Sequence, residues 1–147
     1  DLLHHLGGGG PSRREAIGGP VISSEIDIAN ARLVYPGGCV ANVTASRVSG
    51  TPLRKFRLFQ ASGYLSIDFL EQSAVAFHRV EDGGGTPRIE MERLEIDRAD
   101  ALLAQLRPFV AAVRTRSAPA VTGEDALRTL RTALRVVAAM PPIDELR

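Results

Sequence analysis

The sequence predicts an α+β fold with a largely antiparallel, open β-sheet and helices packed on one of its faces. Residues 14–96 contain several short stretches in which apolar and polar residues alternate, and turns rich in glycine and proline separate them. Strands joined in this way pair as antiparallel neighbours. Two longer stretches with helical periodicity follow, and a sheet with one apolar face needs helices to cover it.

The stretch Asp27–Ser49 predicts a β-hairpin, because a Pro-Gly-Gly turn interrupts two runs of similar length. A two-residue loop at Gly37-Gly38 would pair Leu33 with Asn42 and would mix apolar and polar residues on both faces. A three-residue loop pairs Leu33 with Ala41 instead and makes one face wholly apolar. A shift of one residue turns every side chain to the other face, so we predict the second register.

This register has three consequences. Gly38 takes the left-handed position of the bulge that closes the turn. Asp27 and Arg47 form a cross-strand charge pair at the open end of the hairpin. Cys39 lies on the apolar face as a small buried residue. The predicted apolar face consists of Ala29, Ala31, Leu33, Tyr35, Cys39, Ala41, Val43 and Ala45, and the mixed face of Ile28, Asn30, Arg32, Val34, Val40, Asn42, Thr44 and Ser46.

The same alternation predicts strands on both sides of the hairpin. We expect a short strand within Arg14–Ile22, interrupted by Gly18-Gly19-Pro20. The turn Glu81–Pro87 separates the last two strands. The later strands are expected at Leu53–Ala61, Gly63–Leu70, Ser73–Val80 and Arg88–Ile96.

Two amphipathic helices are predicted after the strands. The first, Ala99–Arg116, contains Pro108, which removes a backbone donor and should bend or divide the helix. Thr122 caps the second, with Glu124 and Asp125 in its first turn. We expect each helix to bury its apolar stripe against the sheet. The stripes are Leu102, Leu103, Leu106, Phe109, Val110 and Val113 in the first helix and Leu127, Leu130, Leu134 and Val137 in the second.

The chain begins with Asp1–Leu6, which is typical of a helix end, and Gly7–Gly10 stops that helix. The four glycines are not a phosphate-binding loop, because no strand precedes them and no Gly-Lys-Ser/Thr follows. We expect a single domain over residues 1–147, in which residues 1–10 are a helix end and a glycine-rich connector. A start at Asp rather than Met leads us to expect a fragment of a longer protein.

Composition argues against several classes of function. The formal net charge of +1 indicates no broad attraction to nucleic acid or to membranes. No apolar run approaches the roughly 18 residues of a membrane-spanning helix, and no signal peptide is visible. The single cysteine, Cys39, excludes an internal disulfide and fits a reducing compartment. We therefore expect a cytoplasmic protein without nucleic-acid or membrane partners.

The residues that could carry chemistry do not complete an active site. His4 and His5 diverge by about 100° on a helix and cannot share a metal ion, so we expect one packed and one solvated imidazole. His78 has no metal-ligand partner at a suitable spacing, and no basic neighbour activates Cys39 as a nucleophile. The residues alone therefore predict no catalytic residue and no metal site.

Several segments resemble the C-terminal domain of the Gfo/Idh/MocA family of NAD(P)-dependent sugar oxidoreductases, and together they cover nearly the whole chain. They are DLLHHL, DIANARL with GCVANVTASRVS, RKFRLF with GYLSIDF, LLAQLRPFVAAV and VTGEDALRTLRTAL. Members of the family have an N-terminal Rossmann domain, which holds NAD or NADP, and a C-terminal α+β domain that closes over the substrate.

The resemblance places Asp1 at the closing position of the family's His-x-x-Asp motif. The catalytic histidine, the catalytic lysine and the dinucleotide fingerprint would then lie outside this chain, and neither His4 nor His5 matches that histidine. The resemblance implies substrate-binding residues here but no catalytic and no cofactor-binding residue. The candidates for substrate binding are Asp1, Arg47 and Asp27.

Two functions of different classes remain. In the first, the chain is the substrate-binding and oligomerisation half of an NAD(P)-dependent dehydrogenase, inactive by itself. The resemblance implies a sugar or nucleotide sugar as substrate, such as UDP-N-acetylglucosamine oxidised at its 3-hydroxyl. In the second, the chain is a non-catalytic interaction module. Family members commonly associate through the open face of this sheet, so we expect a homodimer formed through the mixed face of the hairpin.

Overall fold

The structure is a computed structural model that describes residues 1–81 and 86–141. The described residues form two compact units, and the chain passes from one to the other after Gly50 and again after Arg107. The first unit contains Asp1–Gly50 and the helical segment that begins at Pro108, and the second contains Thr51–Arg107. Helices and purely antiparallel sheets confirm the predicted α+β class.

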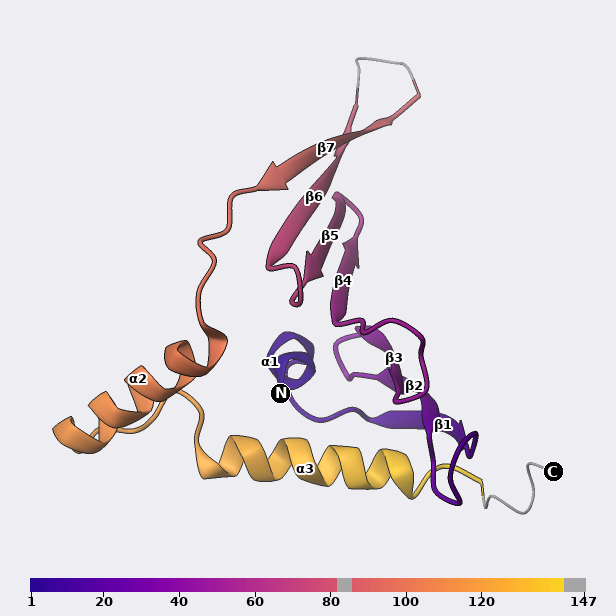
Figure 1. Cartoon of the computed structure of the whole chain (residues 1–147). Helices are drawn as coiled ribbons and strands as arrows, with labels where there is room; N and C mark the ends of the chain where they lie inside the picture. The colour runs from indigo at the N-terminus through magenta and orange to yellow at the C-terminus, as the bar shows by residue number, and fades with distance from the viewer. Residues whose placement is uncertain (82–85, 142–147) are drawn as a thin grey trace. The chain divides into compact units, whose positions relative to one another are not determined.

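The first unit contains a three-stranded antiparallel sheet and two complete helices, coloured indigo, purple and yellow in Figure 1. The strand order is β1-β2-β3, so the hairpin contributes the central strand and one edge. The elements are α1 (Leu2–Gly7), β1 (Arg13–Gly19), β2 (Ile28–Val34), β3 (Val40–Ser46) and α3 (Gly123–Val137).

The hairpin has the register that the sequence predicts. Leu33 lies opposite Ala41, and the Tyr35 N–H donates to the Cys39 carbonyl at 2.8 Å, which closes the three-residue loop. Gly38 has a φ of 84°, the left-handed conformation that favours glycine. The expected burial of Cys39 is wrong, because this residue lies in the turn outside the paired strands and is exposed.

The core of the first unit lies on the predicted apolar face of the hairpin. Leu33, Tyr35 and Ala41 are buried, and Leu3 of α1 and Val136 of α3 pack against them. A Cβ atom at Gly7 would lie 2.3 Å from the Tyr35 ring, so only glycine allows α1 to approach this closely. Two helices therefore cover this face, and the exposed mixed face remains open as predicted.

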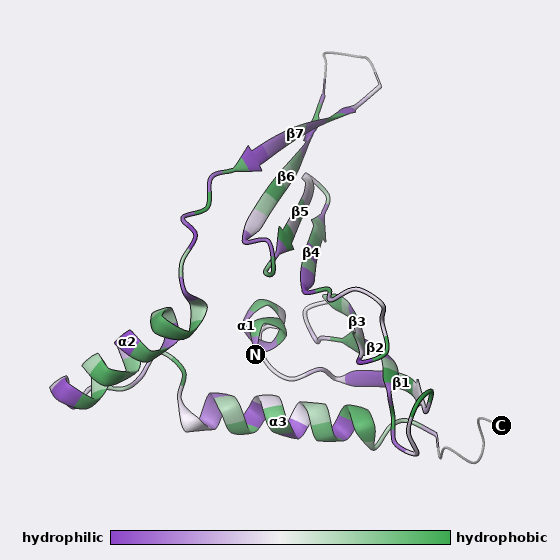
Figure 2. Ribbon diagram, viewed as in Figure 1, coloured by the Kyte–Doolittle hydropathy of each residue, from purple (hydrophilic) through white to green (hydrophobic). Residues whose placement is uncertain are grey.

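The side of α3 that faces inward is not the predicted one. Asp125, Thr129, Thr132 and Val136 are the partly buried residues of this helix, whereas Leu130 and Leu134 are 55% and 60% exposed. The prediction that the leucine stripe packs on the sheet is therefore wrong. Figure 2 shows the alternation of hydrophobic and hydrophilic residues along this helix. Amphipathicity correctly indicated a helix, but it did not identify the side that meets the sheet.

The second unit is a four-stranded antiparallel meander, ordered β4-β5-β6-β7. The predicted strands are all present, so the strands of the described chain divide between two sheets. Part of the predicted turn between the last two strands, residues 82–85, lies outside the described residues. The strands are β4 (Lys55–Gln60), β5 (Gly63–Asp68), β6 (Ser73–Val80) and β7 (Arg88–Leu94).

Helix α2 (Ala101–Thr115) crosses the boundary between the units and continues through Pro108, so the proline does not divide it. Its predicted buried stripe is exposed, from 43% at Leu103 to 64% at Leu102, and Ala112 is the residue of this helix that is buried. The expectation of a buried stripe is wrong here too. No helix within the described residues is both long and apolar enough to cross a membrane.

Candidate functional site

A buried carboxylate lies at the open end of the hairpin. Asp27 immediately precedes β2, and its side chain is fully buried. Its Oδ2 accepts hydrogen bonds from the backbone N–H groups of Val21 and Ile22 at 2.8 Å and of Ser23 at 2.9 Å. These three donors belong to the loop between β1 and β2, so one carboxylate holds that loop against the hairpin.

Arg47 completes the cross-strand pair that the register predicts. Its Nε donates to Asp27 Oδ1, and its Nη2 donates to Ser23 Oγ at 2.6 Å. The Ser23 hydroxyl in turn donates to Asp27 Oδ1 at 2.9 Å. Asp27, Ser23 and Arg47 therefore form one closed polar network, and 55% of the Arg47 side chain remains exposed to solvent.

Hydrogen bonding keeps Asp27 ionised. The backbone N–H of Val21 contributes most to lowering the pKa of Asp27 far below its ordinary value, and Ile22, Ser23 and Arg47 lower it further. The carboxylate is therefore charged at neutral pH and compensates part of the Arg47 charge. No described residue bonds to Nη1 of Arg47, so this end of the guanidinium can bind a phosphate or a sugar hydroxyl.

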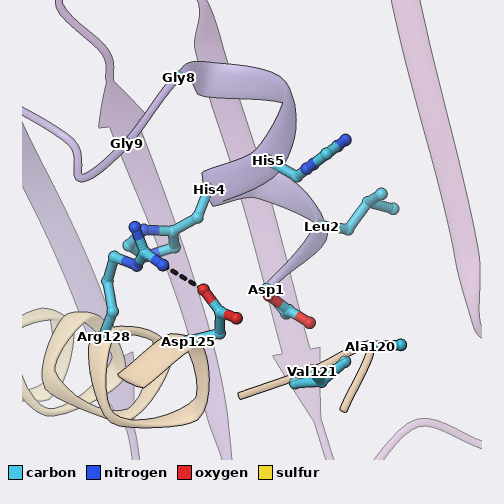
Figure 3. Close-up of a pocket in the computed structure, with 10 residues that line it drawn as sticks. All are labelled: Asp1, Leu2, His4, His5, Gly8, Gly9, Ala120, Val121, Asp125 and Arg128. Carbon is cyan, nitrogen blue, oxygen red and sulfur yellow. Dashed lines mark hydrogen bonds and ion pairs between the residues drawn. The ribbon is translucent and has the colours of Figure 1, made fainter. Parts of the chain in front are cut away.

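A second candidate region lies between α1 and the first turns of α3. It is a cavity of about 520 Å³ within the first unit (Figure 3). Asp1 lies here, as do both neighbouring histidines. The lining residues are Asp1, Leu2, His4, His5, Gly8, Gly9, Ala120, Val121, Asp125 and Arg128.

His4 holds α1 against α3. It is only 9% exposed, and its Nε2 lies 2.9 Å from Thr132 Oγ1, while no described residue bonds to its buried Nδ1. Burial is the main cause that lowers the pKa of His4, and the Arg128 charge acts in the same direction. His5 is exposed. The expected pair of one packed and one solvated imidazole is therefore confirmed.

The other wall of the cavity is the first turn of α3. Thr122 and Asp125 form a reciprocal capping box, and Asp125 also pairs with Arg128 (Figure 3). The hydrogen bond from the Thr122 hydroxyl is the main cause that lowers the pKa of Asp125. The sequence predicted the Thr122 cap, but it gave no signal that Asp125 and Arg128 would line a cavity beside His4.

The structure brings Asp27 and Arg47 together but does not place Asp1 beside them. Asp27 precedes β2, whereas α1 packs at Tyr35, directly after the last residue of that strand. A strand rises about 3.3 Å per residue, so the seven residues of β2 separate the two regions by about 20 Å. The three candidate substrate-binding residues thus belong to two regions of the first unit.

No group of three or more histidine, cysteine or acidic side chains that could hold a metal ion is found among residues 1–81 and 86–141. His78 does have an acidic neighbour, because Nε2 lies 3.0 Å from Glu92 Oε2 on the adjacent strand. Strand pairing, and not sequence spacing, brings these two residues together.

Comparison with known proteins identifies similar enzymes. UDP-N-acetylglucosamine 3-dehydrogenase of Acidithiobacillus ferrooxidans is 33% identical over 144 residues, which is 95% of this chain and 45% of that protein. Its solved structure matches with a TM-score of 0.83 at 31% identity, over 95% of this chain and 43% of that one. No family model matches the chain.

Two further structures share the fold. Aldose-aldose oxidoreductase from Caulobacter crescentus gives a TM-score of 0.70 at 24% identity, over 99% of this chain and 42% of that one. A protein assigned as an NADPH-dependent oxidoreductase from Desulfitobacterium hafniense gives a TM-score of 0.76 at 16% identity, over 99% of this chain and 43% of that one. The chain spans less than half the length of each of these proteins.

Proposed function

Because the chain belongs to the Gfo/Idh/MocA-like oxidoreductases, we propose that it is the substrate-binding and oligomerisation part of a nucleotide-sugar dehydrogenase. The 33% identity to UDP-N-acetylglucosamine 3-dehydrogenase, over 95% of this chain, supports this proposal most directly. NAD or NADP would bind to a part of the enzyme outside the matched 45%. The proposal takes residues 1–147 as one functional domain and places the enzyme in the cytoplasm.

Arg47 is the residue we propose to contact substrate. Asp27 and Ser23 orient its guanidinium, and its exposed end can donate to a phosphate of a nucleotide sugar. Asp27 acts through Arg47, because its own carboxylate is enclosed by the loop. Asp1 would contribute a separate contact at the cavity beside α1.

Calorimetric titration with UDP-N-acetylglucosamine tests this role. The Arg47→Ala variant should bind at least about tenfold more weakly, since a charge-assisted hydrogen bond contributes about 1.5–3 kcal/mol. The substitution should have little effect on the melting temperature compared with its effect on affinity, because Asp27 keeps its three backbone donors. Arg57→Ala, at an exposed arginine of β4, is the matched control. If the unmodified chain binds no nucleotide sugar, the proposal is contradicted and the alternative of a non-catalytic interaction module is favoured.

The proposal also expects no catalysis by the 147-residue chain alone. A cofactor must be held and oriented for hydride transfer, and the sequence offers no fingerprint or catalytic lysine for that purpose. Nicotinamide absorbance should stay at background with a panel of sugars. Sugar-dependent turnover by this chain would contradict the assignment of a cofactor-free half.

The mixed face of the hairpin is the proposed dimer interface. Arg32 donates to Asn42 at 3.1 Å and Thr44 donates to Asn30 at 2.8 Å, so ordered polar groups lie beside exposed aliphatic side chains. Such a surface can meet a second copy around a two-fold axis. Arg32→Glu should shift the equilibrium from dimer towards monomer, which light scattering measures. A monomeric unmodified chain at high micromolar concentration would exclude the dimer.

A further inference from the structure

The cavity between α1 and α3 has the size of a small-molecule site. Its volume of about 520 Å³ lies within the range of roughly 300–1,000 Å³ that is typical of such sites. All its lining residues belong to the first unit, so its shape depends on contacts within that unit alone. Gly8 and Gly9 line it with positive φ angles of 71° and 135°, and glycine leaves this part of the wall without side chains.

Arg128 contributes an oriented guanidinium to the cavity. Its Nη2 donates to Asp125 Oδ1, and Asp125 Oδ2 accepts from the Thr122 N–H at 3.1 Å and from the Thr122 hydroxyl at 2.7 Å. No described residue bonds to Nε or Nη1 of Arg128, so these nitrogens retain donors for a ligand. The arrangement repeats that of Asp27 and Arg47, in which an aspartate held by backbone N–H groups orients an arginine.

Helix α1 contributes an imidazole that lacks one hydrogen bond. His4 lines the cavity and is 9% exposed, its Nε2 bonds to Thr132, and its buried Nδ1 has no partner among the described residues. Burial is the main cause that lowers the pKa of His4, and the Arg128 side chain, which extends from α3 towards this ring in Figure 3, adds to it. The imidazole is therefore neutral at pH 7, with one nitrogen that donates and one that accepts. A buried polar atom without a partner indicates a place for another polar group.

The charges that line the cavity favour a neutral ligand over an anion. Asp125 compensates the charge of Arg128, and the carboxylate of Asp1 lines the cavity as well. A phosphate or a carboxylate would therefore meet no excess of positive side-chain charge here. A hydroxyl group both donates and accepts, so a molecule with several hydroxyls can use the donors of Arg128 and the acceptor of Asp1 together.

We propose that this cavity binds a neutral, hydroxyl-rich molecule of monosaccharide size. Arg128 contacts the molecule, Asp125 is the positioning residue, and a hydroxyl supplies the hydrogen bond that His4 lacks. This site is separate from the phosphate site proposed at Arg47, because the seven residues of β2 place the two regions about 20 Å apart. It rests on the proposed function only for Asp1, whose ligand contact is made here.

Titration with D-glucose, followed by NMR of the histidine rings, tests the site. The chain has three histidines, of which His4 and His5 line the cavity and His78 lies in the second unit. We expect glucose to shift the ring signals of His4 and His5 but not those of His78, the reference in the same molecule. Arg128→Ala should raise the dissociation constant at least about tenfold, because it removes charged donors. Arg131→Ala, at an exposed arginine of α3 outside the cavity lining, is the matched control and should leave binding unchanged.

D-glucuronate, which carries a carboxylate on the same ring, tests the charge argument. It should bind more weakly than glucose, and tighter binding would overturn the proposal in favour of an anion site. Absence of any shift at high millimolar glucose, or an equal shift of His78, would also overturn it. If Arg128→Ala does not fold, Arg128→Lys is measured instead, because it keeps the charge but not the planar fork. An unchanged dissociation constant in the variant that folds would exclude the proposed contact.

Arg47→Ala separates this site from the proposed function. It should weaken the binding of UDP-N-acetylglucosamine and leave the binding of glucose unchanged. Glucose binding without nucleotide-sugar binding would contradict the proposed function alone. Nucleotide-sugar binding without glucose binding would overturn the cavity proposal alone.

Discussion

The two sheets differ in how their apolar residues are covered. In the first unit, α1 and α3 enclose one face of the sheet around Leu33 and Tyr35, and the opposite face is largely polar. In the second unit, Ala74 is the buried hydrophobic residue among those described, and Phe59 is 68% exposed. The first sheet thus has a core of its own, whereas the second needs contacts from beyond its four strands to bury its apolar side chains.

Both sheets nevertheless use an aspartate to hold a strand end. Asp27 binds three backbone N–H groups and Arg47 in the first unit. Asp68 accepts from Leu70 and Glu71 at 3.0 and 3.2 Å and pairs with Lys55 at 3.3 Å in the second. The Asp27 side chain is fully buried, whereas that of Asp68 is 17% exposed. Substitutions in the two sheets can therefore be compared as matched pairs.

The largest expected difference is between Leu33→Ala and Phe59→Ala. Leu33 is 4% exposed in the core, so its truncation should lower the free energy of unfolding by about 2–5 kcal/mol. Phe59 is mostly exposed and stacks on Tyr64 at 5.1 Å, so its loss should cost about 1 kcal/mol or less. Urea denaturation followed by circular dichroism measures both. Equal losses would show that the second sheet has a core as complete as the first.

A smaller contrast is expected between Asp27→Asn and Asp68→Asn. Hydrogen bonds from backbone N–H groups lower the pKa of both carboxyls, those of Val21 and Glu71 contributing most. A lowered pKa in the folded state stabilises the protein above the unfolded pKa of about 3.9, and this stabilisation is lost as the pH falls through the folded pKa. Melting temperatures from pH 7 to pH 2 should show the larger deficit for Asp27→Asn at neutral pH, converging with the unmodified chain in acid. A deficit that does not change with pH would contradict the electrostatic explanation.

The smallest expected effect concerns His4, which lies in the cover of the first sheet. Its pKa is lowered in the folded state, mainly by burial, so the unfolded state binds more protons near the ordinary value of about 6.5. The melting temperature should therefore fall between pH 7 and pH 5. His4→Gln should flatten this dependence, whereas His5→Gln, at an exposed position, should retain it. If the melting temperature of His4→Gln depends on pH as steeply as that of the unmodified chain, His4 does not make the packing of α1 dependent on pH.

The hairpin was predictable because its signals are local. The Pro-Gly-Gly turn and the alternation of residues on both sides left two registers, and only one of them produced an apolar face. That choice also predicted the Asp27–Arg47 pair, which the structure contains. Strand positions in the second unit followed from the same alternation and the turns between the strands.

The cover of the sheets was not predictable in the same way. A leucine stripe shows that a helix has one apolar side, but it does not identify the surface that this side meets. In α3, the hydrogen bond between Thr132 and His4 and the packing of Val136 on the hairpin core determine the inward side. The first contact depends on α1 and the second on the hairpin, and both lie far away in sequence. The stripe predictions therefore failed although the helices themselves were correct.

The candidate site was predictable only in part. Register predicted that Asp27 meets Arg47, but the three backbone donors and Ser23 come from an irregular loop with no periodic pattern. A serine four residues before the aspartate is the one local signal, and it is too common to indicate a network. The cavity beside α1 required the contact between α1 and α3, which no short-range pattern encodes.

The bond from Arg47 to Ser23 also has a consequence for the entropy of binding. A free arginine side chain loses about 2 kcal/mol of rotamer entropy when it is fixed in one orientation. In this chain the loss accompanies folding, because Ser23 Oγ and Asp27 already hold the guanidinium. A ligand that docks on Arg47 therefore meets a donor with little conformational freedom left to lose. That difference corresponds to about tenfold to thirtyfold in affinity.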